Sequence, residues 1–313
     1  MKSIKWDGTA ITKPGIYTGV PIEKYHSQDV CDGPSISSSG LRAIVLKSPA
    51  HFYATWDGNK QREPEKPARH FIIGRAVHHL ILGEPGFAKL FAVQPDDYED
   101  EKTGEIKNWN NNAGACKRWH EARQKEKRLV LTSSEVMNIR GMAMTLSKNP
   151  IVRAGALNGL IERSIFWKDK ETGVWLKARP DSIPNHSGDF VDLKTTESVL
   201  YPRLVYAIGE YAYHAQGALV CRGAREVLGI ERPTFSLVFV EKTMPWCDYV
   251  VTIKEDALKQ GAKMNRVALD TFARCLEAER WPGPGNERSD AQPIELSDRA
   301  KQAIDDKLTL MEA

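Results

Sequence analysis

The sequence predicts an α/β (α+β) fold in which a mixed central β-sheet is flanked by helices, with a helical amino-terminal part. Two observations lead to this prediction. Apolar residues recur at helical spacing before about residue 157, whereas short runs of alternating polarity, separated by glycine turns, follow residue 158. The 313 residues, 41% of them apolar, are also enough to build a substantial core.

The same change of periodicity divides the chain into parts. Residues 1–34 are predicted to be an amino-terminal extension and residues 281–313 a carboxy-terminal tail. Between them we expect one domain over residues 35–280, made of a helical part (35–157), a sheet core (158–255) and a last helix (255–280).

Three helices are predicted in the first half. Residues 37–56 begin with serines suited to an N-cap and form a helix that ends near Pro49. Residues 68–83 form a second helix that Gly83 ends, and residues 132–150 a third, with a capping box at its start and Pro150 at its end. The polar residues 102–114 are predicted to form a mobile loop.

The second half begins with three predicted strands and continues with a helix and a strand pair. The strands cover residues 159–167, 174–183 and 188–196, and the sequence DKETG forms the turn between the first two. A long helix over 205–229, ending at Gly229, precedes two strands at 235–242 and 248–254 that form a hairpin.

Composition excludes several classes of protein. Forty-four basic residues against 41 acidic ones leave a net charge of only +3, so a polyanion would bind a local groove and not a uniformly basic surface. The five cysteines form no CxxC pair, which argues against a zinc ribbon, an iron–sulfur cluster or a disulfide framework and favours buried thiols. No segment has the length of a signal peptide core or a membrane span, and we expect a cytoplasmic protein without a membrane partner.

Charged residues interrupt the strand predicted at 188–196. Because side chains alternate along a strand, Asp192 and Lys194 share one face while Val191 and Leu193 share the other. Asp181, at the end of the preceding strand, can lie beside Asp192, and two neighbouring carboxylates favour Mg²⁺ or Mn²⁺ between them. The alternative is an ordinary cross-strand salt bridge on a solvated face.

Four short motifs, in this order along the chain, resemble those of the PD-(D/E)XK nuclease superfamily. Gly74 and His78 of GRAVH match a GxxxH helix, Pro180 and Asp181 match PD, Asp192, Leu193 and Lys194 match (D/E)XK, and Tyr213, His214 and Gln216 of YAYHAQ lie where family members carry a glutamine near a tyrosine. The order of helix, strands and helix agrees over residues 35–255. The resemblance is greatest to RecE-type exonuclease VIII, and more distant to lambda exonuclease and the RecB nuclease domain.

The resemblance implies a restriction-endonuclease-like core and a set of site residues. His78, Asp181, Asp192 and the carbonyl of Leu193 are expected to bind Mg²⁺, which Mn²⁺ can replace, and Lys194 is expected to assist the attack of water. Glu162 is either a further carboxylate of the site or an exposed strand residue. Gln216 either orients the lysine, the water or the phosphate, or belongs to a polar helix face.

The resemblance further implies a substrate and partners. We expect a double-strand DNA exonuclease that degrades linear DNA from its ends, 5′ to 3′, and leaves 3′ overhangs for a RecT-like single-strand annealing protein of phage-type recombination. A homo-oligomeric ring, trimeric or tetrameric, is expected. The alternatives are a RecB-like or Cas4-like nuclease without an iron–sulfur cluster, and a DNA-end-binding protein without activity.

Two further segments are candidates for DNA contacts. The start of the first helix, with its serines and Arg42, can bind a terminal phosphate, although plain N-capping explains the serines equally. Tyr213 is a further candidate DNA-binding residue. Residues 117–128 are rich in basic side chains and can follow a DNA backbone, while a solvated helix face with interspersed glutamates is the alternative.

Overall fold

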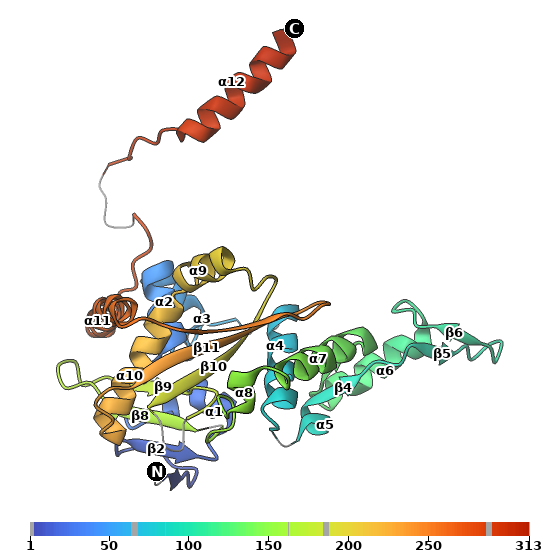
Figure 1. Ribbon diagram of the computed structural model, residues 1–313, viewed down its shortest axis with the longest axis horizontal. Helices are drawn as coiled ribbons and strands as arrows, with labels where there is room; N and C mark the ends of the chain where they lie inside the picture. The colour runs from blue at the N-terminus through green and yellow to red at the C-terminus, as the bar shows by residue number, and fades with distance from the viewer. Residues whose placement is uncertain are drawn as a thin grey trace.

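The architecture is a sheet core with helices on its faces and an arm that extends to one side. The computed structural model describes residues 3–63, 68–84, 86–161, 163–183, 188–285 and 290–312. In Figure 1, α2, α10 and α11 lie beside the central strands β8 to β11, the arm with α6, β5 and β6 extends to the right, and α12 lies apart from the body. The prediction of a mixed α/β fold with a helix-flanked sheet is confirmed.

The helices occupy these ranges: α1 Ile22–His26, α2 Ser38–Leu46, α3 Pro49–Thr55, α4 Arg69–Ile81, α5 Phe87–Leu90, α6 Gly114–Lys125, α7 Ser133–Leu146, α8 Pro150–Arg153, α9 Tyr201–Glu210, α10 Tyr213–Leu228, α11 Glu255–Ala278 and α12 Asp298–Glu312, with a 3-10 turn at Gln28–Val30. The strands are β1 Ile4–Lys5, β2 Gly15–Thr18, β3 Ser35–Ser37, β4 Phe91–Val93, β5 Asp97–Glu99, β6 Ile106–Asn108, β7 Leu129–Leu131, β8 Ser164–Lys168, β9 Trp175–Ala178, β10 Asp189–Thr196, β11 Thr234–Glu241 and β12 Asp248–Thr252.

Two sheets make up the core, and they meet at the end of β9. The larger has the order β1-β2-β8-β9-β3, and the smaller has the order β10-β11-β12. A pair of backbone hydrogen bonds between Ser182 and Val191 joins them just past the end of β9. Strand β10 therefore touches the first sheet at one point, while it pairs along its whole length with β11, in parallel.

The alternation of β10 separates two packing environments. Val191 and Leu193 are buried against α4 and α7, in a cluster that includes Val77 and Met142. Phe190 faces the opposite side, in the cluster that includes α10. Because side chains alternate, Asp192 and Lys194 lie on this second face, as the sequence predicts.

Helix α4 is held so that its last turn reaches β10. At its start, Arg69 forms an ion pair with Glu135, the residue whose side chain also completes the capping box of α7 with Thr132. Ala76 and Val77 are fully buried against the sheet. The chain leaves the helix through Gly83, which has a φ of +70°, so the predicted end of this helix and the predicted capping box of α7 are confirmed.

Three predicted helix ranges are wrong in part. The helix predicted over 205–229 is two helices, α9 and α10, separated at Ala212, whose φ is +48°. The first helix within 37–56 ends near Pro49, as predicted. Pro49 then begins a second helix, α3, because proline is well suited to the first turn of a helix. Helix α7 ends at Leu146, before Pro150, which begins α8.

Other expectations from the sequence also require correction. The segment 102–114 is not one loop, since residues Ile106–Asn108 form β6 and pair with β5. Residues 3–34, described above as an extension, supply β1 and β2, and β2 pairs with β8 of the main sheet. Cys247 is exposed, although the other four cysteines are buried as predicted. In the described part of the chain, no helix has the length and hydropathy of a membrane span.

Candidate active site

The fold brings five predicted site residues together from four elements. Strand β10 carries Asp192 and Lys194, the segment after β9 carries Asp181, α4 carries His78 and α10 carries Gln216. The contacts given below link all five residues into one cluster.

Asp181 is the centre of the first half of the cluster. Its Oδ2 accepts a 2.7 Å hydrogen bond from the backbone amide of Leu193, and its Oδ1 lies 3.2 Å from Nδ1 of His78. The other ring nitrogen of His78, Nε2, lies 3.1 Å from the carbonyl oxygen of Leu193. Since both nitrogens face oxygen atoms, the imidazole is positioned to donate twice in its protonated form.

Asp192 is the centre of the second half. Its Oδ2 forms an ion pair with Nζ of Lys194 and accepts a 3.0 Å hydrogen bond from Nε2 of Gln216. The Asp192 side chain is only 3% exposed, and that of Lys194 is 19% exposed. A buried carboxylate is thus neutralised by a lysine that still reaches solvent.

Charge and burial act in opposition on the pKa values of the cluster. Burial opposes ionisation of Asp181, but the adjacent His78 and Lys194 outweigh it and lower the pKa of that carboxyl. Burial and the neighbouring Asp181 raise the pKa of Asp192, in spite of Lys194. Burial also disfavours the charged forms of His78 and Lys194, yet the two carboxylates raise the pKa of both.

The donor atoms of the cluster suit a hard divalent cation. Two carboxylates, one backbone carbonyl and one imidazole match the preferences of Mg²⁺ and Mn²⁺. Oε1 of Gln216 is buried and has no hydrogen-bond partner within the described residues, so a ligand that donates a hydrogen bond beside Asp192 would satisfy it. In these same residues no three His, Cys, Asp or Glu side chains are grouped as metal ligands; His78 contacts Asp181, and Lys194 pairs with Asp192.

Arg42 and Tyr213 lie at the edge of this cluster. The guanidinium of Arg42 lies 5.9 Å from the centroid of the Tyr213 ring, and Nζ of Lys194 lies 5.2 Å from the same centroid. Arg42 also donates a 2.7 Å hydrogen bond to the carbonyl of Tyr211, while its Nε is buried without a partner in the described chain. The structure therefore brings Arg42 and Lys194 to the same ring, that of Tyr213.

The serines near Arg42 do not cap α2 in the predicted way. Ser37 occupies the N-cap position but forms no capping hydrogen bond through its side chain, and its Oγ contacts Oγ of Ser39 instead. Among the hydroxyls of Ser37, Ser38 and Ser39, only that of Ser38 has no partner in the described chain, and it is buried.

Other candidates are outside the cluster. Glu162 lies outside the residues that the structure describes. His214 contacts the carbonyl of Ile208 and the sulfur of Met264, on another side of α10 from Gln216. The basic residues 117–128 lie on and after α6 in the arm, where Arg118 and Arg123 are paired with glutamates, as the alternative of a solvated helix face predicts.

Arg179 and Lys177 form a basic pair on a buried ring that the motifs did not indicate. The guanidinium of Arg179 lies 4.9 Å from the centroid of the Tyr25 ring, and its Nε donates to Oγ of Ser164 at 2.7 Å. Nζ of Lys177 lies 5.6 Å from the same centroid. The spacing of these two residues by two positions is the signal that would have placed them on one side of the predicted strand.

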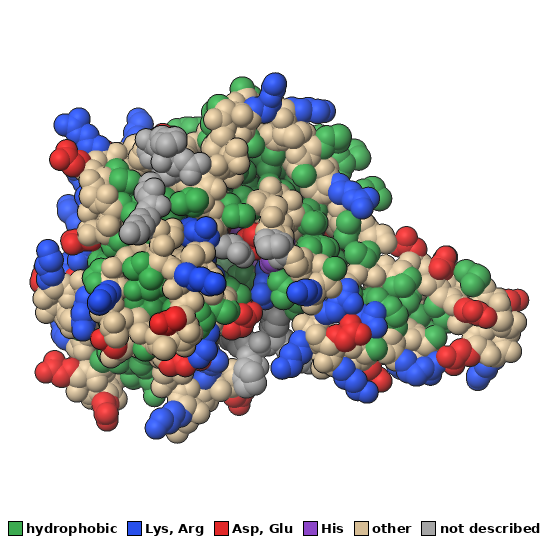
Figure 2. Space-filling view, turned by 90° about the horizontal axis from the view of Figure 1, so that it is seen from below, with side chains coloured by type: hydrophobic (Ala, Val, Ile, Leu, Met, Phe, Trp, Pro, Cys, Tyr) green, Lys and Arg blue, Asp and Glu red, His purple; other side chains and the backbone are tan. Residues whose placement is uncertain are grey.

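The surface is open to solvent at the site. The side chain of His78 is 29% exposed and that of Asp181 is 14% exposed. On the face shown in Figure 2, the surface is hollowed near its middle, with histidine and acidic side chains inside the hollow and Lys and Arg side chains around it. A polyanion can therefore approach without meeting a uniformly acidic surface.

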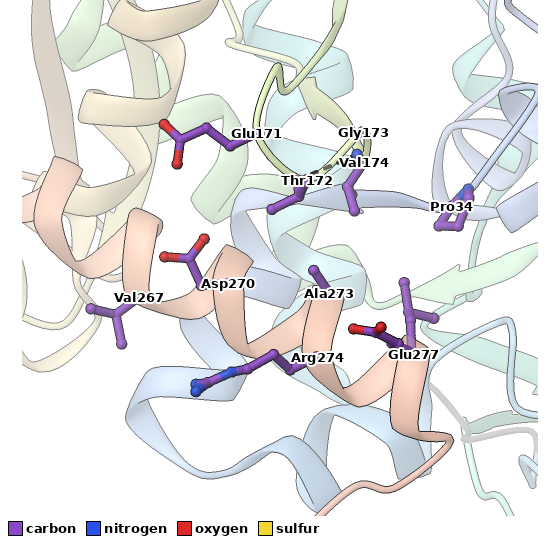
Figure 3. Close-up of a pocket in the computed structure, with 11 residues that line it drawn as sticks. Pro34, Glu171, Thr172, Gly173, Val174, Val267, Asp270, Ala273, Arg274 and Glu277 are labelled. Carbon is purple, nitrogen blue, oxygen red and sulfur yellow. Dashed lines mark hydrogen bonds between the residues drawn. The ribbon is translucent and has the colours of Figure 1, made fainter.

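A separate pocket of about 830 Å³ lies between α11 and the turn that joins β8 to β9. Figure 3 shows Glu171 in this turn and Asp270, Arg274 and Glu277 on α11 around it. None of the cluster residues lines this pocket.

A PD segment just past β9, joined through the bridge between Ser182 and Val191 to a DxK segment on β10, with a histidine and a glutamine supplied by helices, defines a PD-(D/E)XK-type core. The chain belongs to the family described as a PDDEXK-like domain of unknown function (DUF3799), whose match covers residues 37–290. This places it in the PD-(D/E)XK nuclease superfamily, as the motifs indicate, but does not single out the RecE-type subgroup.

One solved structure shows the same fold. A candidate exonuclease from Eubacterium rectale aligns over 89% of this chain and 97% of its own, with a TM-score of 0.59 and 13% sequence identity. The structure of SSO0001 covers 64% of this chain and 85% of its own at 13% identity, with a TM-score of 0.27, on which no argument is based. No curated protein matches the sequence.

Proposed function

We propose that the protein is a metal-dependent exodeoxyribonuclease that hydrolyses linear double-stranded DNA from its ends. The observation that carries this proposal is the cluster itself, in which Asp181 contacts His78 and the backbone of Leu193, while the adjacent Asp192 pairs with Lys194. Such a set of oxygen and imidazole donors next to a lysine suits the hydrolysis of a phosphodiester.

The residues have separate roles in this proposal. Asp181, Asp192, His78 and the carbonyl of Leu193 would hold Mg²⁺, and the bound ion would lower the pKa of water and neutralise charge on the phosphate. Lys194 would leave its ion pair with Asp192 and stabilise the negative charge that develops on the phosphate. Gln216, whose Oε1 has no partner within the described residues, would orient the attacking water.

Two features support attack from a 5′ end. Arg42 presents a buried Nε without a partner among the described residues, and Oγ of Ser38 has none either, so both can bind a terminal phosphate. Tyr213 lies between Arg42 and Lys194 and so connects such a phosphate site to the cluster. Degradation from 5′ to 3′ would leave 3′ overhangs.

The wider context follows from the resemblance to RecE-type enzymes. A 3′ overhang is the substrate of a single-strand annealing protein, and we propose a RecT-like partner in phage-type recombination. We also propose a trimeric or tetrameric ring in the cytoplasm of a bacterial cell. A ring would keep the enzyme on one duplex through many cycles of hydrolysis.

The central experiment compares Asp192→Asn with a matched control. Purified protein is incubated with linear duplex DNA in Mg²⁺ and in EDTA, and the release of nucleotides is measured. Wild-type protein is expected to release nucleotides only in Mg²⁺, and Asp192→Asn to release none. Asp189→Asn changes an exposed aspartate of the same strand and is expected to remain active.

The same experiment separates this function from its alternatives. Closed circular DNA is expected to persist, since it has no end. Cleavage of closed circles would identify an endonuclease of the same superfamily. Binding of DNA ends without any release, in Mg²⁺ or Mn²⁺, would identify an end-binding protein and contradict the proposal.

A further inference from the structure

Helix α9 presents an apolar face to solvent, flanked by its two exposed charged residues, Arg203 and Glu210. Its outward side contains Pro202, Val205, Tyr206 and Gly209, all exposed, and Tyr201 lies beside them. Tyr201, Val205 and Tyr206 are 63%, 53% and 65% exposed. The opposite side of the helix is anchored by Leu204, which is buried in the main core. The exposed rings therefore belong to a fixed helix and not to a loose loop.

This helix leads directly into the candidate active site. It begins five residues after the end of β10, the strand that carries Asp192 and Lys194, and it ends beside Tyr211. The carbonyl of Tyr211 accepts the hydrogen bond from Arg42, and the Tyr211 ring lies 5.6 Å from the Tyr213 ring. Tyr211 is itself 55% exposed. A row of exposed side chains thus runs along α9 to the tyrosine that Lys194 and Arg42 share.

The size of this face limits what can cover it. A ten-residue helix is about 15 Å long. One side of such a helix is much smaller than the roughly 800 Å² per partner that a stable protein interface requires. The same length accommodates about four stacked nucleobases. Tyrosine rings stack on bases of any sequence, and the face has no acidic residue at its centre to repel the phosphates.

We infer that α9 is a stacking surface for the unpaired bases of a single DNA strand next to the site of hydrolysis. The inference rests on the proposed function, which it extends from duplex ends to the single-stranded part of the substrate. The bases of a strand that has left the duplex lose their stacking partners, and exposed rings on α9 would replace these partners. The enzyme would then bind a frayed or single-stranded end more tightly than a blunt one.

The test measures binding without hydrolysis. Fluorescence anisotropy in EDTA gives the Kd of the full chain for an oligothymidine strand and for the same strand with abasic residues in place of its bases. Wild-type protein is expected to bind the strand with bases at least tenfold more tightly. The double variant Tyr201→Ala/Tyr206→Ala is expected to lose most of this difference, and Tyr201→Phe/Tyr206→Phe to keep it.

Controls distinguish the possible outcomes. Tyr249→Ala removes a tyrosine ring from β12 that is also exposed, at 43%, and this variant is expected to bind both strands as the wild type does. Unchanged base dependence in the double alanine variant would overturn the inference. So would a change in oligomeric state in that variant, measured by light scattering, because the face would then contact a second copy. Neither result bears on hydrolysis, and a wild-type protein without nuclease activity would overturn the proposed function separately.

Discussion

The backbone amide of Leu193 donates a 2.7 Å hydrogen bond to Oδ2 of Asp181, so the residue between Asp192 and Lys194 also holds the carboxylate of the other strand. One strand therefore supplies two charged side chains and orients a third. An asparagine at position 181 can still accept this hydrogen bond, but it loses the charge.

We therefore expect Asp181→Asn to separate structure from activity. The variant should unfold within a few degrees of the wild type, because its Oδ1 can accept from Leu193. Its nuclease activity should fall about 1,000-fold, since a lost metal ligand removes several kcal/mol of charge stabilisation. Thermal unfolding and nucleotide release measure the two effects. Full activity in this variant would show that Asp181 holds no metal.

The variant Lys194→Ala should lose nuclease activity and still bind the metal ion. Lys194 neutralises Asp192 in the structure, and its removal leaves both carboxylates accessible to a divalent cation. Nucleotide release should fall at least 100-fold. The Kd for Mn²⁺, measured by calorimetry, should remain within about threefold of wild type. Asp192→Asn serves as the comparison. An equal loss of Mn²⁺ affinity in both variants would contradict the separate roles.

Arg42→Ala should reduce discrimination between DNA ends. A terminal phosphate carries more charge than an internal diester and can accept paired hydrogen bonds from a guanidinium. Wild-type protein should degrade 5′-phosphorylated duplex about tenfold faster than 5′-hydroxyl duplex, and the variant should degrade both at similar rates. End-labelled strands report the direction. Loss of the 3′ label first would reverse the assigned polarity.

Lys177→Met should stabilise the protein at neutral pH. Burial lowers the pKa of Lys177 from 10.5 to about 8, and the side chain is 2% exposed, with its Nζ donating to the carbonyl of Ser27. Because the folded state binds this proton more weakly than the unfolded state does, stability rises as pH rises from about 8 to 10.5. At pH 7 the methionine should add about 2 kcal/mol to the free energy of unfolding.

Urea denaturation at several pH values checks this prediction. The difference in stability between Lys177→Met and the wild type should shrink above pH 8. Exposed Lys168, on the neighbouring strand, provides a control, since Lys168→Met removes a solvated charge and should change stability little. A destabilised Lys177→Met variant would show that contacts of the lysine outweigh its burial.

Asp169→Asn should destabilise the core. Asp169 is 1% exposed and accepts hydrogen bonds from Arg222 and Arg266, which hold α10 and α11 against the turn after β8. Burial opposes its ionisation, but the two guanidiniums outweigh this effect and lower its pKa. The ionised carboxyl of Asp169 therefore contributes to the free energy of unfolding above about pH 4, and this contribution is lost as pH falls below that value.

Asparagine at this position leaves two partly buried guanidiniums without their shared carboxylate. The free energy of unfolding at pH 7 should fall by about 3 kcal/mol. The difference in the free energy of unfolding between variant and wild type should disappear in acid, where the wild-type carboxyl is protonated and therefore as neutral as asparagine. An unchanged midpoint of urea denaturation at pH 7 would contradict the assigned role.

The sequence indicated which side chains come together better than it indicated how the strands pair. Strand alternation grouped Asp192 with Lys194 and suggested Asp181 beside them, and the resemblance to family motifs added His78 and Gln216. Both kinds of signal are local. The parallel pairing of β10 with β11 and the position of β2 beside β8 depend on contacts between distant segments. Periodicity carries no information about such contacts.

The break between α9 and α10 shows why local signals were insufficient. Helical spacing of apolar residues continues through position 212, and alanine is a strong helix former. Ala212 nevertheless adopts a left-handed conformation, and the carbonyl just before it accepts a hydrogen bond from Arg42, 169 residues earlier. A contact across such a distance ends the helix where the sequence contains neither glycine nor proline.

The pairing of β2 with β8 has a consequence for how the protein is made. Ile16 faces Ile165 in this pairing, so the second strand of the chain, which pairs with β1 along one edge, has no partner along its other edge until half of the protein has left the ribosome. During that interval its apolar side chains are exposed to other nascent chains. We expect folding to be slow for a protein of this size, and release from the ribosome to depend on protection of the first twenty residues.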